Sequence, residues 1–331
     1  MTTERFNAMV VEAGEDRTYV RQIKERTLDD LPAGDVLIRV NYSSLNYKDA
    51  LSATGNRGVT RSYPHTPGID AAGIVAESKA DAIKKGDPVL VTGYDLGMNT
   101  AGGFGQYIRV PGEWVVPLPA GLSFKESMIY GTAGFTAGMS VLFLTEHLNP
   151  QDGPVLVTGA TGGVGSVSVA VLAKLGYTVA ALTGKPTEAP FLKHLGASQI
   201  VERENAVDTS GRPLLKGQWA GVVDTVGGAI LATAIKSTQP WGTITCCGNV
   251  ASADLPLTVY PFILRGLRLI GIDSQNCPMD IRLRVWQKLA SDWKAERLGS
   301  LCTEISLDQL SDNIDLILKG RQKGRVVVKL G

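Results

Sequence analysis

The stretch Val155–Leu175 constrains the fold of this chain more than any other, because it reads as a strand, a glycine-rich turn and a helix in direct succession. Residues 155–158 are apolar or β-branched and predict a buried strand, and apolar residues after the turn recur at helical spacing. The turn has the pattern Ala160-x-Gly162-x-x-Gly165. Glycine lets a backbone approach a pyrophosphate closely, and a helix N-terminus offers free N–H groups to the anion. The stretch therefore predicts a dinucleotide-binding turn; a tight turn without a ligand is the alternative.

The rest of the chain predicts two domains around this turn. Strands and helices alternate from residue 155 to residue 272, which predicts a doubly wound parallel sheet. Before the proline-rich segment 117–122 the chain reads as a mostly antiparallel β domain, and residues 325–330 read as a strand that returns to it. We therefore expect an α/β protein with a Rossmann nucleotide domain at 126–273 and a second domain made of 1–125 and 274–331.

Composition and charge exclude several classes of protein. The 331 residues carry 33 Lys and Arg against 32 Asp and Glu, and a net charge of +1 gives no electrostatic basis for binding nucleic acid or an acidic membrane. No apolar run reaches the ~18 residues of a membrane span, and the segment Met1–Asn7 lacks the apolar core of a signal peptide. The four cysteines form no C-x-x-C pair and are expected to be reduced core thiols. We expect a cytoplasmic protein with no membrane partner.

The end of the second strand of the nucleotide domain indicates which cofactor is preferred. A carboxylate at this point would bind the adenosine ribose of NAD, whereas hydroxyl or basic side chains suit the 2′-phosphate of NADP. The strand ends in Thr183-Gly184-Lys185 without an acidic residue, and Arg203 follows the third strand as a second cation. The alternative is that both cations are solvated surface charges. The pattern favours NADPH over NADH, with Thr183, Gly184, Lys185 and Arg203 at the adenosine end.

The order of these motifs resembles that of the medium-chain dehydrogenase/reductase superfamily, in which a GroES-like β domain precedes a nucleotide domain and the chain then returns to the first. Longer motifs resemble the YhdH/YhfP group of quinone oxidoreductases, which includes acrylyl-CoA reductases, and the resemblance extends over essentially the whole chain. These motifs are SSLNYKDA at 43–50, PGIDAAG at 67–73, GTAGFTA at 131–137, DTVG at 224–227, PFILR at 261–265 and GIDS at 271–274.

The resemblance also bears on metals. In zinc alcohol dehydrogenases a cysteine stands where this chain has Asn46, and a His-Glu pair stands where it has Ile69-Asp70. Ile69 has no atom that binds a metal, and no cysteine precedes Cys246, so the closely spaced cysteines of a structural zinc site are missing. The three histidines fall in unrelated contexts. We expect no metal.

Without a metal, an NADPH-dependent enzyme can reduce a carbon–carbon double bond that a carbonyl group polarises. Hydride then reaches the β-carbon, the developing enolate needs stabilisation, and the α-carbon needs a proton. Tyr47 is the first candidate for this site, either as a binding residue or as the acid, and Asn46 can donate a hydrogen bond to an oxyanion. Arg325 could contact a CoA phosphate or another domain.

The resemblance and the fold imply further contacts and an activity. The reaction expected is reduction of acrylyl-CoA to propionyl-CoA by NADPH; the alternatives are an NADPH:quinone oxidoreductase and an NADPH-binding protein without turnover. The substrate would be a small α,β-unsaturated thioester or a quinone, and the resemblance implies a homodimer. The remaining residues expected at the cofactor are Tyr47, Ala160, Thr161, Gly162, Gly163, Val164, Gly165, Asn249, Ile263 and Ser274.

Overall fold

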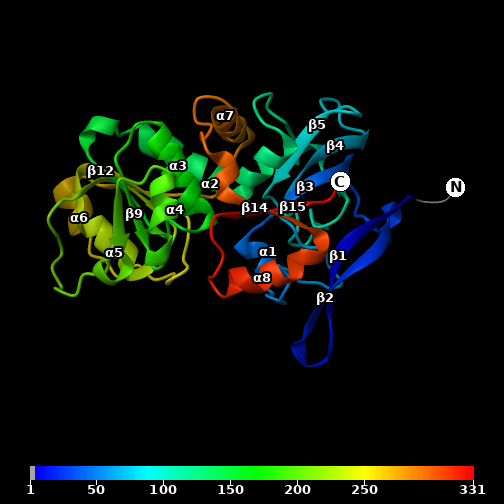
Figure 1. Ribbon diagram of the computed structural model, residues 1–331, viewed down its shortest axis with the longest axis horizontal. Coiled ribbons are helices and arrows are strands. Elements are labelled where there is room, and N and C mark those ends of the chain that lie inside the picture. The colour runs from blue at the N-terminus through cyan, green and yellow to red at the C-terminus, as the bar shows by residue number, and fades with distance from the viewer. Residues whose placement is uncertain (1–3) are drawn as a thin grey trace. The chain divides into compact units, whose positions relative to one another are not determined.

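The computed structural model describes residues 4–331, so the first part of the polar segment Met1–Asn7 lies outside it. The chain divides into two compact units, each with its own sheet and core (Figure 1). The first unit consists of Met1–Thr132, Gln275–Pro278 and Gly299–Gly331, and the second consists of Ala133–Ser274 and Met279–Leu298.

The second unit is built on a six-stranded sheet in the order β10-β9-β8-β11-β12-β13, with every neighbouring pair parallel. The predicted α/β fold with a doubly wound parallel sheet is confirmed. Strand β11 is buried along its whole length, as expected for a parallel strand in the middle of a sheet. The strands are β8 (Val155–Val157), β9 (Val179–Thr183), β10 (Gln199–Glu202), β11 (Trp219–Asp224), β12 (Thr238–Cys246) and β13 (Arg268–Gly271).

Helices connect the strands of this sheet, and one further helix follows its last strand. They are α3 (Gly163–Lys174), α4 (Ala189–His194), α5 (Gly228–Lys236), α6 (Tyr260–Arg265) and α7 (Met279–Ala290). Helix α7 belongs to the second unit, whereas the sequence placed residues 274–331 together in the other domain. The reason is packing: the Trp286 ring of α7 stacks on Phe135 with centroids 5.9 Å apart, and Val285 lies against Gly138.

The first unit contains a mostly antiparallel sheet in the order β14-β15-β3-β4-β5-β7, with β6 also paired to β3, and a separate hairpin of β1 and β2. Strand β15 pairs with β3, so that Val326 lies opposite Leu45 (Figure 1). The helices are α1 (Tyr47–Ser52) and α8 (Leu310–Leu318). The strands are β1 (Arg5–Ala13), β2 (Tyr19–Thr27), β3 (Val36–Leu45), β4 (Asp70–Ser78), β5 (Pro88–Thr92), β6 (Tyr107–Val110), β7 (Val116–Pro117), β14 (Cys302–Ser306) and β15 (Arg325–Lys329).

Alternation of side chains along β3 shows how the core of the first unit forms. Val36, Ile38 and Val40 point to one face and join a buried cluster with Ile108 of β6 and Val328 of β15. The two halves of β3 thus differ: the first is apolar on the core face, and the second contains the buried polar pair Ser43 and Ser44 directly before its last residue, Leu45.

Helix α2 (Phe124–Thr145) starts in the first unit and ends in the second. By length and composition this helix is apolar enough to cross a membrane, in contrast to the expectation that no apolar run is long enough. However, 83% of its most apolar 18-residue stretch is buried inside the protein. The helix is also broken at Gly131, where φ is +50° and ψ is −157°. A Cβ at this position would overlap Asp70 and Ser44, so the break requires glycine.

Candidate functional site

The glycine turn lies at the carboxyl end of β8, where ligands bind in open parallel sheets. Gly159 has φ +60°, and the Gly162 N–H donates to its carbonyl at 2.9 Å, which turns the chain into α3. A Cβ at Gly165 would overlap the Gly159 carbonyl, so this glycine allows α3 to pack against the strand. The helix α3 begins at Gly163 and has no side-chain cap, which leaves its first N–H groups available to an anion. The turn therefore has the geometry of a phosphate site.

Four residues expected at the adenosine end lie together at the carboxyl end of β9. The Thr183 and Thr161 hydroxyls are 3.4 Å apart, and the Lys185 N–H donates to Thr183 Oγ1 at 2.9 Å. The Arg203 side chain lies directly over Gly184, since a Cβ at this position would come within 3.2 Å of the Arg203 Cδ. No carboxylate belongs to this group, which makes it suited to a phosphate.

A cavity of about 520 Å³ begins beside these residues. Its lining combines Arg203 and Glu204 with mostly apolar side chains from α5 and the loops near it, a surface that offers apolar area to a planar ring. The lining residues are Arg203, Glu204, Val207, Ala229, Ile230, Ala251 and Ser252.

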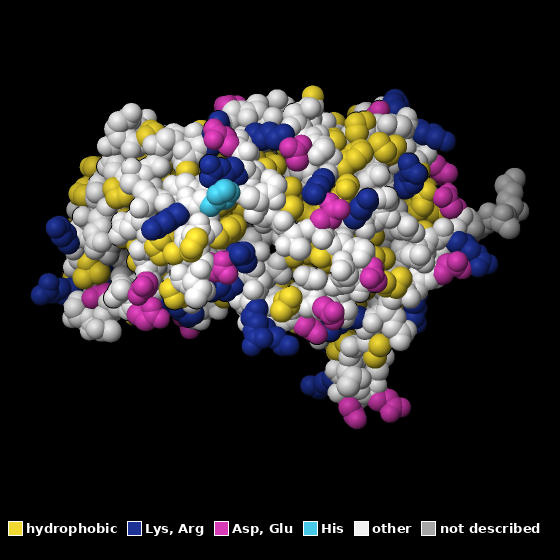
Figure 2. Space-filling view, viewed as in Figure 1, with side chains coloured by type: hydrophobic (Ala, Val, Ile, Leu, Met, Phe, Trp, Pro, Cys, Tyr) yellow, Lys and Arg dark blue, Asp and Glu magenta, His cyan; other side chains and the backbone are white. Residues whose placement is uncertain are grey.

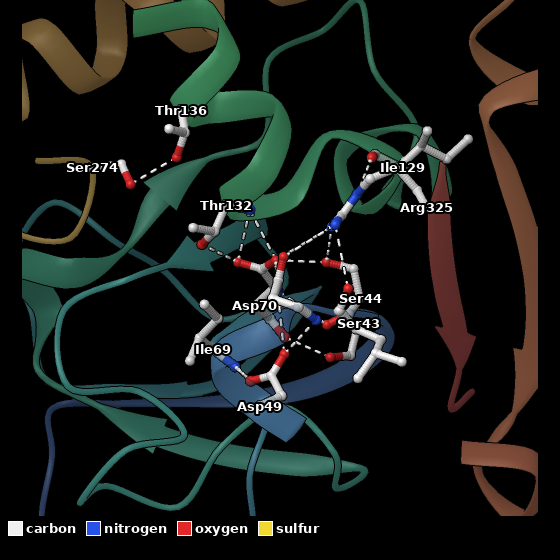
Figure 3. Close-up of polar contacts among 12 residues, drawn as sticks. Ser43, Ser44, Asp49, Ile69, Asp70, Ile129, Thr132, Thr136, Ser274 and Arg325 are labelled. Carbon is white, nitrogen blue, oxygen red and sulfur yellow. Dashed lines mark hydrogen bonds and ion pairs between the residues drawn. The ribbon is translucent and has the colours of Figure 1, made fainter. Parts of the chain in front are cut away.

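The other residues assigned to the cofactor are spread over three segments. Asn249 is exposed in the loop after β12, and its Cα lies close to Gly227. The Ser274 hydroxyl follows β13 and accepts a hydrogen bond from Thr136 at 2.7 Å (Figure 3). Ile263 is 70% exposed on α6, in the connection between β12 and β13, so its assignment depends on the resemblance alone.

In the first unit, Asn46 and Tyr47 begin helix α1. Asn46 is the N-cap, and its backbone N–H and side chain both bond to Asp49 three residues on, which forms a capping box. Tyr47 follows at the first helical position and is 52% exposed. Within residues 4–331 its phenol hydroxyl makes no hydrogen bond, so it is available to a ligand.

Asp70, at the start of β4, is the centre of a buried polar cluster that the sequence did not predict (Figure 3). Its carboxylate accepts hydrogen bonds from Ser44 Oγ at 2.5 Å, Asn46 Nδ2 at 2.8 Å and Thr132 Oγ1 at 2.6 Å. The Thr132 N–H also donates to both carboxylate oxygens, at 3.0 and 2.9 Å, where α2 resumes after its break. The Arg325 guanidinium lies 3.9 Å away and balances the charge. One carboxylate thus joins β3, β4, α2 and β15.

Arg325 does not lie where a CoA phosphate could reach it. Its side chain is 3% exposed and donates to the Ile129 carbonyl at 3.0 Å, to Ser44 Oγ at 2.9 Å and to Asn46 Oδ1 at 3.1 Å. The expectation of a phosphate contact is therefore wrong, because this guanidinium is the internal partner of Asp70.

The same contacts define what Asn46 can do. Because Arg325 can only donate and the Asp70 carboxylate can only accept, the amide oxygen must face Arg325 and the amide nitrogen must face Asp70. The Asn46 amide hydrogens are directed to Asp70 and Asp49, and the residue is 8% exposed. The expected role as oxyanion donor has no support in this arrangement; Asn46 instead positions the start of α1, which carries Tyr47.

Asp49 is the second buried carboxylate of this cluster. It accepts hydrogen bonds from the backbone N–H groups of Asn46 and Ile69, each at 2.8 Å. Burial and the nearby Asp70 carboxylate nevertheless raise the pKa of Asp49 to about 7. The cluster therefore takes up a proton as the pH falls through neutrality.

Asn46 and Ile69-Asp70, the residues that the resemblance aligns with zinc ligands, make other contacts in this structure. Asn46 is bonded on both sides, Ile69 supplies only its backbone, and the cation of Arg325 lies beside Asp70. This donor set does not fit a zinc ion. Among residues 4–331 no group of three or more His, Cys, Asp or Glu side chains could hold a metal.

Charge on the surface gives no second candidate site on the face shown in Figure 2. Lys and Arg side chains alternate there with Asp and Glu side chains, and no broad region of one sign is visible. This distribution agrees with the net charge of +1 and offers nothing for a nucleic acid on that face.

Two family models match the chain. The one described as an alcohol dehydrogenase GroES-like domain matches residues 32–120, and the one described as a zinc-binding dehydrogenase matches residues 163–291. The first lies in the first unit, and nearly all of the second lies in the second unit.

Three similar proteins cover almost the whole chain. Acrylyl-CoA reductase AcuI of Ruegeria pomeroyi is 46% identical over 325 residues, 98% of each chain. YhfP of Bacillus subtilis, provisionally named a quinone oxidoreductase, is 46% identical over 98% of this chain and 99% of its own. The structure of YhfP with NAD bound has a TM-score of 0.96 and 45% identity, and the match covers 99% of this chain and 100% of YhfP. The yhdH oxidoreductase of Salmonella enterica, solved with NADP, has a TM-score of 0.95 and 43% identity over 98% and 100%.

Proposed function

Because this chain belongs to the medium-chain dehydrogenase/reductase family, we propose that it is an NADPH-dependent, zinc-independent reductase of activated carbon–carbon double bonds. Acrylyl-CoA, reduced to propionyl-CoA, is the substrate that we favour. The observation that carries this proposal is the near-full-length similarity to an acrylyl-CoA reductase. We further propose a cytoplasmic homodimer.

The residues of the second unit fit a dinucleotide. In the proposal, the turn from Thr161 to Gly165 contacts the pyrophosphate, with the N–H groups of the first residues of α3 as donors, and the cavity beside Arg203 takes the adenine. Lys185 and Arg203 bind the 2′-phosphate, since the end of β9 offers hydroxyl and cationic groups and no acid. The bound cofactor would supply the hydride.

Removing the cations at the end of β9 should change cofactor preference. The double substitution Lys185→Ala and Arg203→Ala should raise the Kd for NADPH at least about a hundredfold, because each charged contact to a phosphate contributes about 1.5–3 kcal/mol. The Kd for NADH should change little. Fluorescence titration of both cofactors measures this, with Lys193→Ala, an exposed cation on α4, as the control. Equal losses for NADPH and NADH would contradict the assignment.

Tyr47 is the residue that we propose for contact with the cofactor or the substrate. Its hydroxyl is exposed and without an internal partner among residues 4–331, and the buried cluster around Asp70 holds the helix start on which it sits. A phenol is a weak acid, so hydrogen bonding suits this side chain better than direct proton transfer. We therefore propose that Tyr47 binds and that solvent or another group supplies the proton.

The experiment that tests the function compares kcat/KM for acrylyl-CoA and for 1,4-benzoquinone under the same conditions. We expect the thioester to be preferred, and Tyr47→Phe to lower turnover or cofactor affinity about tenfold, the value of roughly one neutral hydrogen bond. Tyr260→Phe, at an equally exposed tyrosine, should have no effect. A kcat/KM at least tenfold higher for the quinone would contradict the thioester assignment and identify the protein as a quinone oxidoreductase. Tight NADPH binding without oxidation by either acceptor would favour a protein without turnover.

A further inference from the structure

The motif Asp224-Thr225-Val226-Gly227 has no part in the site described so far, yet its first residue is a fully buried carboxylate. Asp224 ends β11, the neighbour of β8 in the sheet. Its Oδ1 accepts a hydrogen bond from Thr158 Oγ1 at 2.7 Å, and its Oδ2 accepts from the N–H groups of Gly227 at 2.8 Å and Val226 at 3.2 Å. Asp224 therefore connects the end of β8 with the turn that begins α5.

Thr158 is the residue directly before the glycine turn, and it is 0% exposed. Its hydroxyl donates to Asp224 and accepts from the Thr225 N–H at 3.0 Å, so that both capacities of the hydroxyl are used. In return the Thr225 hydroxyl donates to the Thr158 carbonyl at 2.9 Å. Three hydrogen bonds thus hold the start of the glycine turn against the end of β11.

Close packing makes this connection sensitive to small shifts. A Cβ at Gly159, the first residue of the turn, would overlap the Thr225 side chain, and a Cβ at Gly248 would overlap the Thr225 backbone. Two neighbouring segments therefore approach Thr225 as closely as a glycine allows. A movement of Thr225 would displace the turn.

A buried carboxylate is costly, and within residues 4–331 no lysine or arginine pairs with Asp224. Burial accordingly raises the pKa of its carboxyl group. The hydrogen bonds of this carboxylate fix the start of the glycine turn relative to the turn that begins α5. A turn that binds an anion through backbone N–H groups needs a fixed conformation, because a preorganised site loses less entropy on binding.

We propose that Asp224 and Thr158 are positioning residues that hold the glycine turn in the conformation that binds the pyrophosphate common to NADPH and NADH. The inference rests on the proposed function. It differs from the role given to Lys185 and Arg203, which concerns only the 2′-phosphate. Loss of the Thr158 hydroxyl should therefore weaken both dinucleotides equally and leave a ligand without pyrophosphate unaffected.

The test uses the full chain and three substitutions. Thr158→Val keeps the shape and removes the hydroxyl, and Thr158→Ser keeps the hydroxyl. Thr243→Val is the matched control, because Thr243 is a buried threonine on β12 whose hydroxyl has no hydrogen-bond partner within residues 4–331. Binding of NADPH, NADH and adenosine 2′-phosphate is measured by titration, and folding is checked by urea denaturation.

In Thr158→Val the Kd values for NADPH and NADH should both rise about tenfold, while that for adenosine 2′-phosphate stays unchanged. Thr158→Ser and Thr243→Val should bind all three ligands as the unsubstituted protein does. If Thr158→Val does not fold, Asp224→Leu, which keeps a similar volume and removes both acceptor oxygens, should give the same pattern.

Three results would overturn the inference: unchanged dinucleotide affinity, a loss confined to NADPH, or an equal loss for adenosine 2′-phosphate. An unsubstituted protein that binds neither dinucleotide would overturn the proposed function itself, and is thereby distinguished from a failure of this inference alone.

Discussion

Arg325→Met should lower the free energy of unfolding by about 3–5 kcal/mol, because it leaves a buried carboxylate without its cation. Arg325 is 3% exposed, and Asp70 is 0% exposed. The guanidinium also satisfies the Ile129 carbonyl and the Asn46 amide oxygen, which would lose a donor. Urea denaturation followed by tryptophan fluorescence measures the change.

Two comparisons make this result specific to the buried pair. Arg5→Met removes a cation from the Arg5–Glu25 pair, whose side chains are 70% and 58% exposed, and should cost less than about 1 kcal/mol. The double variant Asp70→Asn with Arg325→Met should lose less than the sum of the two single variants, because the charges are removed together. If Arg325→Met lowers the free energy of unfolding no more than Arg5→Met does, the ion pair of Arg325 with Asp70 does not stabilise the first unit.

The second large effect is a dependence of stability on pH. The pKa of Asp49 is raised to about 7, whereas an aspartate in an unfolded chain has a pKa of about 3.9. Between these values the folded protein keeps a proton that the unfolded protein has released. The free energy of unfolding should therefore decrease as pH rises through this window, by on the order of 4 kcal/mol from this residue, and level off above pH ~7.

Asp49→Asn should remove this slope, because the amide carries no charge at any pH. The measurement is the change in the free energy of unfolding between pH 5 and pH 8. A loss of stability that the substitution causes equally at both pH values cancels in this difference. Asp208→Asn is the control: its hydrogen bond with Lys236 lowers the pKa of Asp208 to about 2, so its contribution is lost only as pH falls below about 4. Equal slopes in Asp49→Asn and the unsubstituted protein would refute the prediction.

The parallel sheet could be predicted because its signals are local. The strands β8, β9 and β11 are short, mostly apolar runs, and the turn after β8 has its glycines at fixed spacing. The position of α7 could not be predicted in the same way. Its amphipathic pattern shows that it buries one face, but the partner of that face, Phe135, lies far away in the sequence. Local patterns predict elements, and distant contacts decide where they pack.

The site shows the same division. The motif around Tyr47 identifies a segment, but the cluster beneath it depends on Asp70, Thr132 and Arg325, which come from three distant segments. One signal was present in the sequence: the two adjacent serines Ser43 and Ser44 lie in a strand whose other buried residues are apolar. Buried hydroxyls need partners, so this pair marks a place where polar groups from elsewhere must converge.

The pairing of β15 with β3 has a consequence for the order in which the protein is made. Strand β15 lies between β14 and β3, so the sheet of the first unit needs residues 302–306 and 325–329, which leave the ribosome after the whole of the second unit. The second unit can therefore fold while synthesis continues, whereas the first unit waits with the segment Tyr42–Leu45 of β3 unpaired on the side that β15 will cover. An unpaired edge is where chains associate wrongly. For this protein the interval before β15 emerges is thus the period in which a chaperone has most to protect.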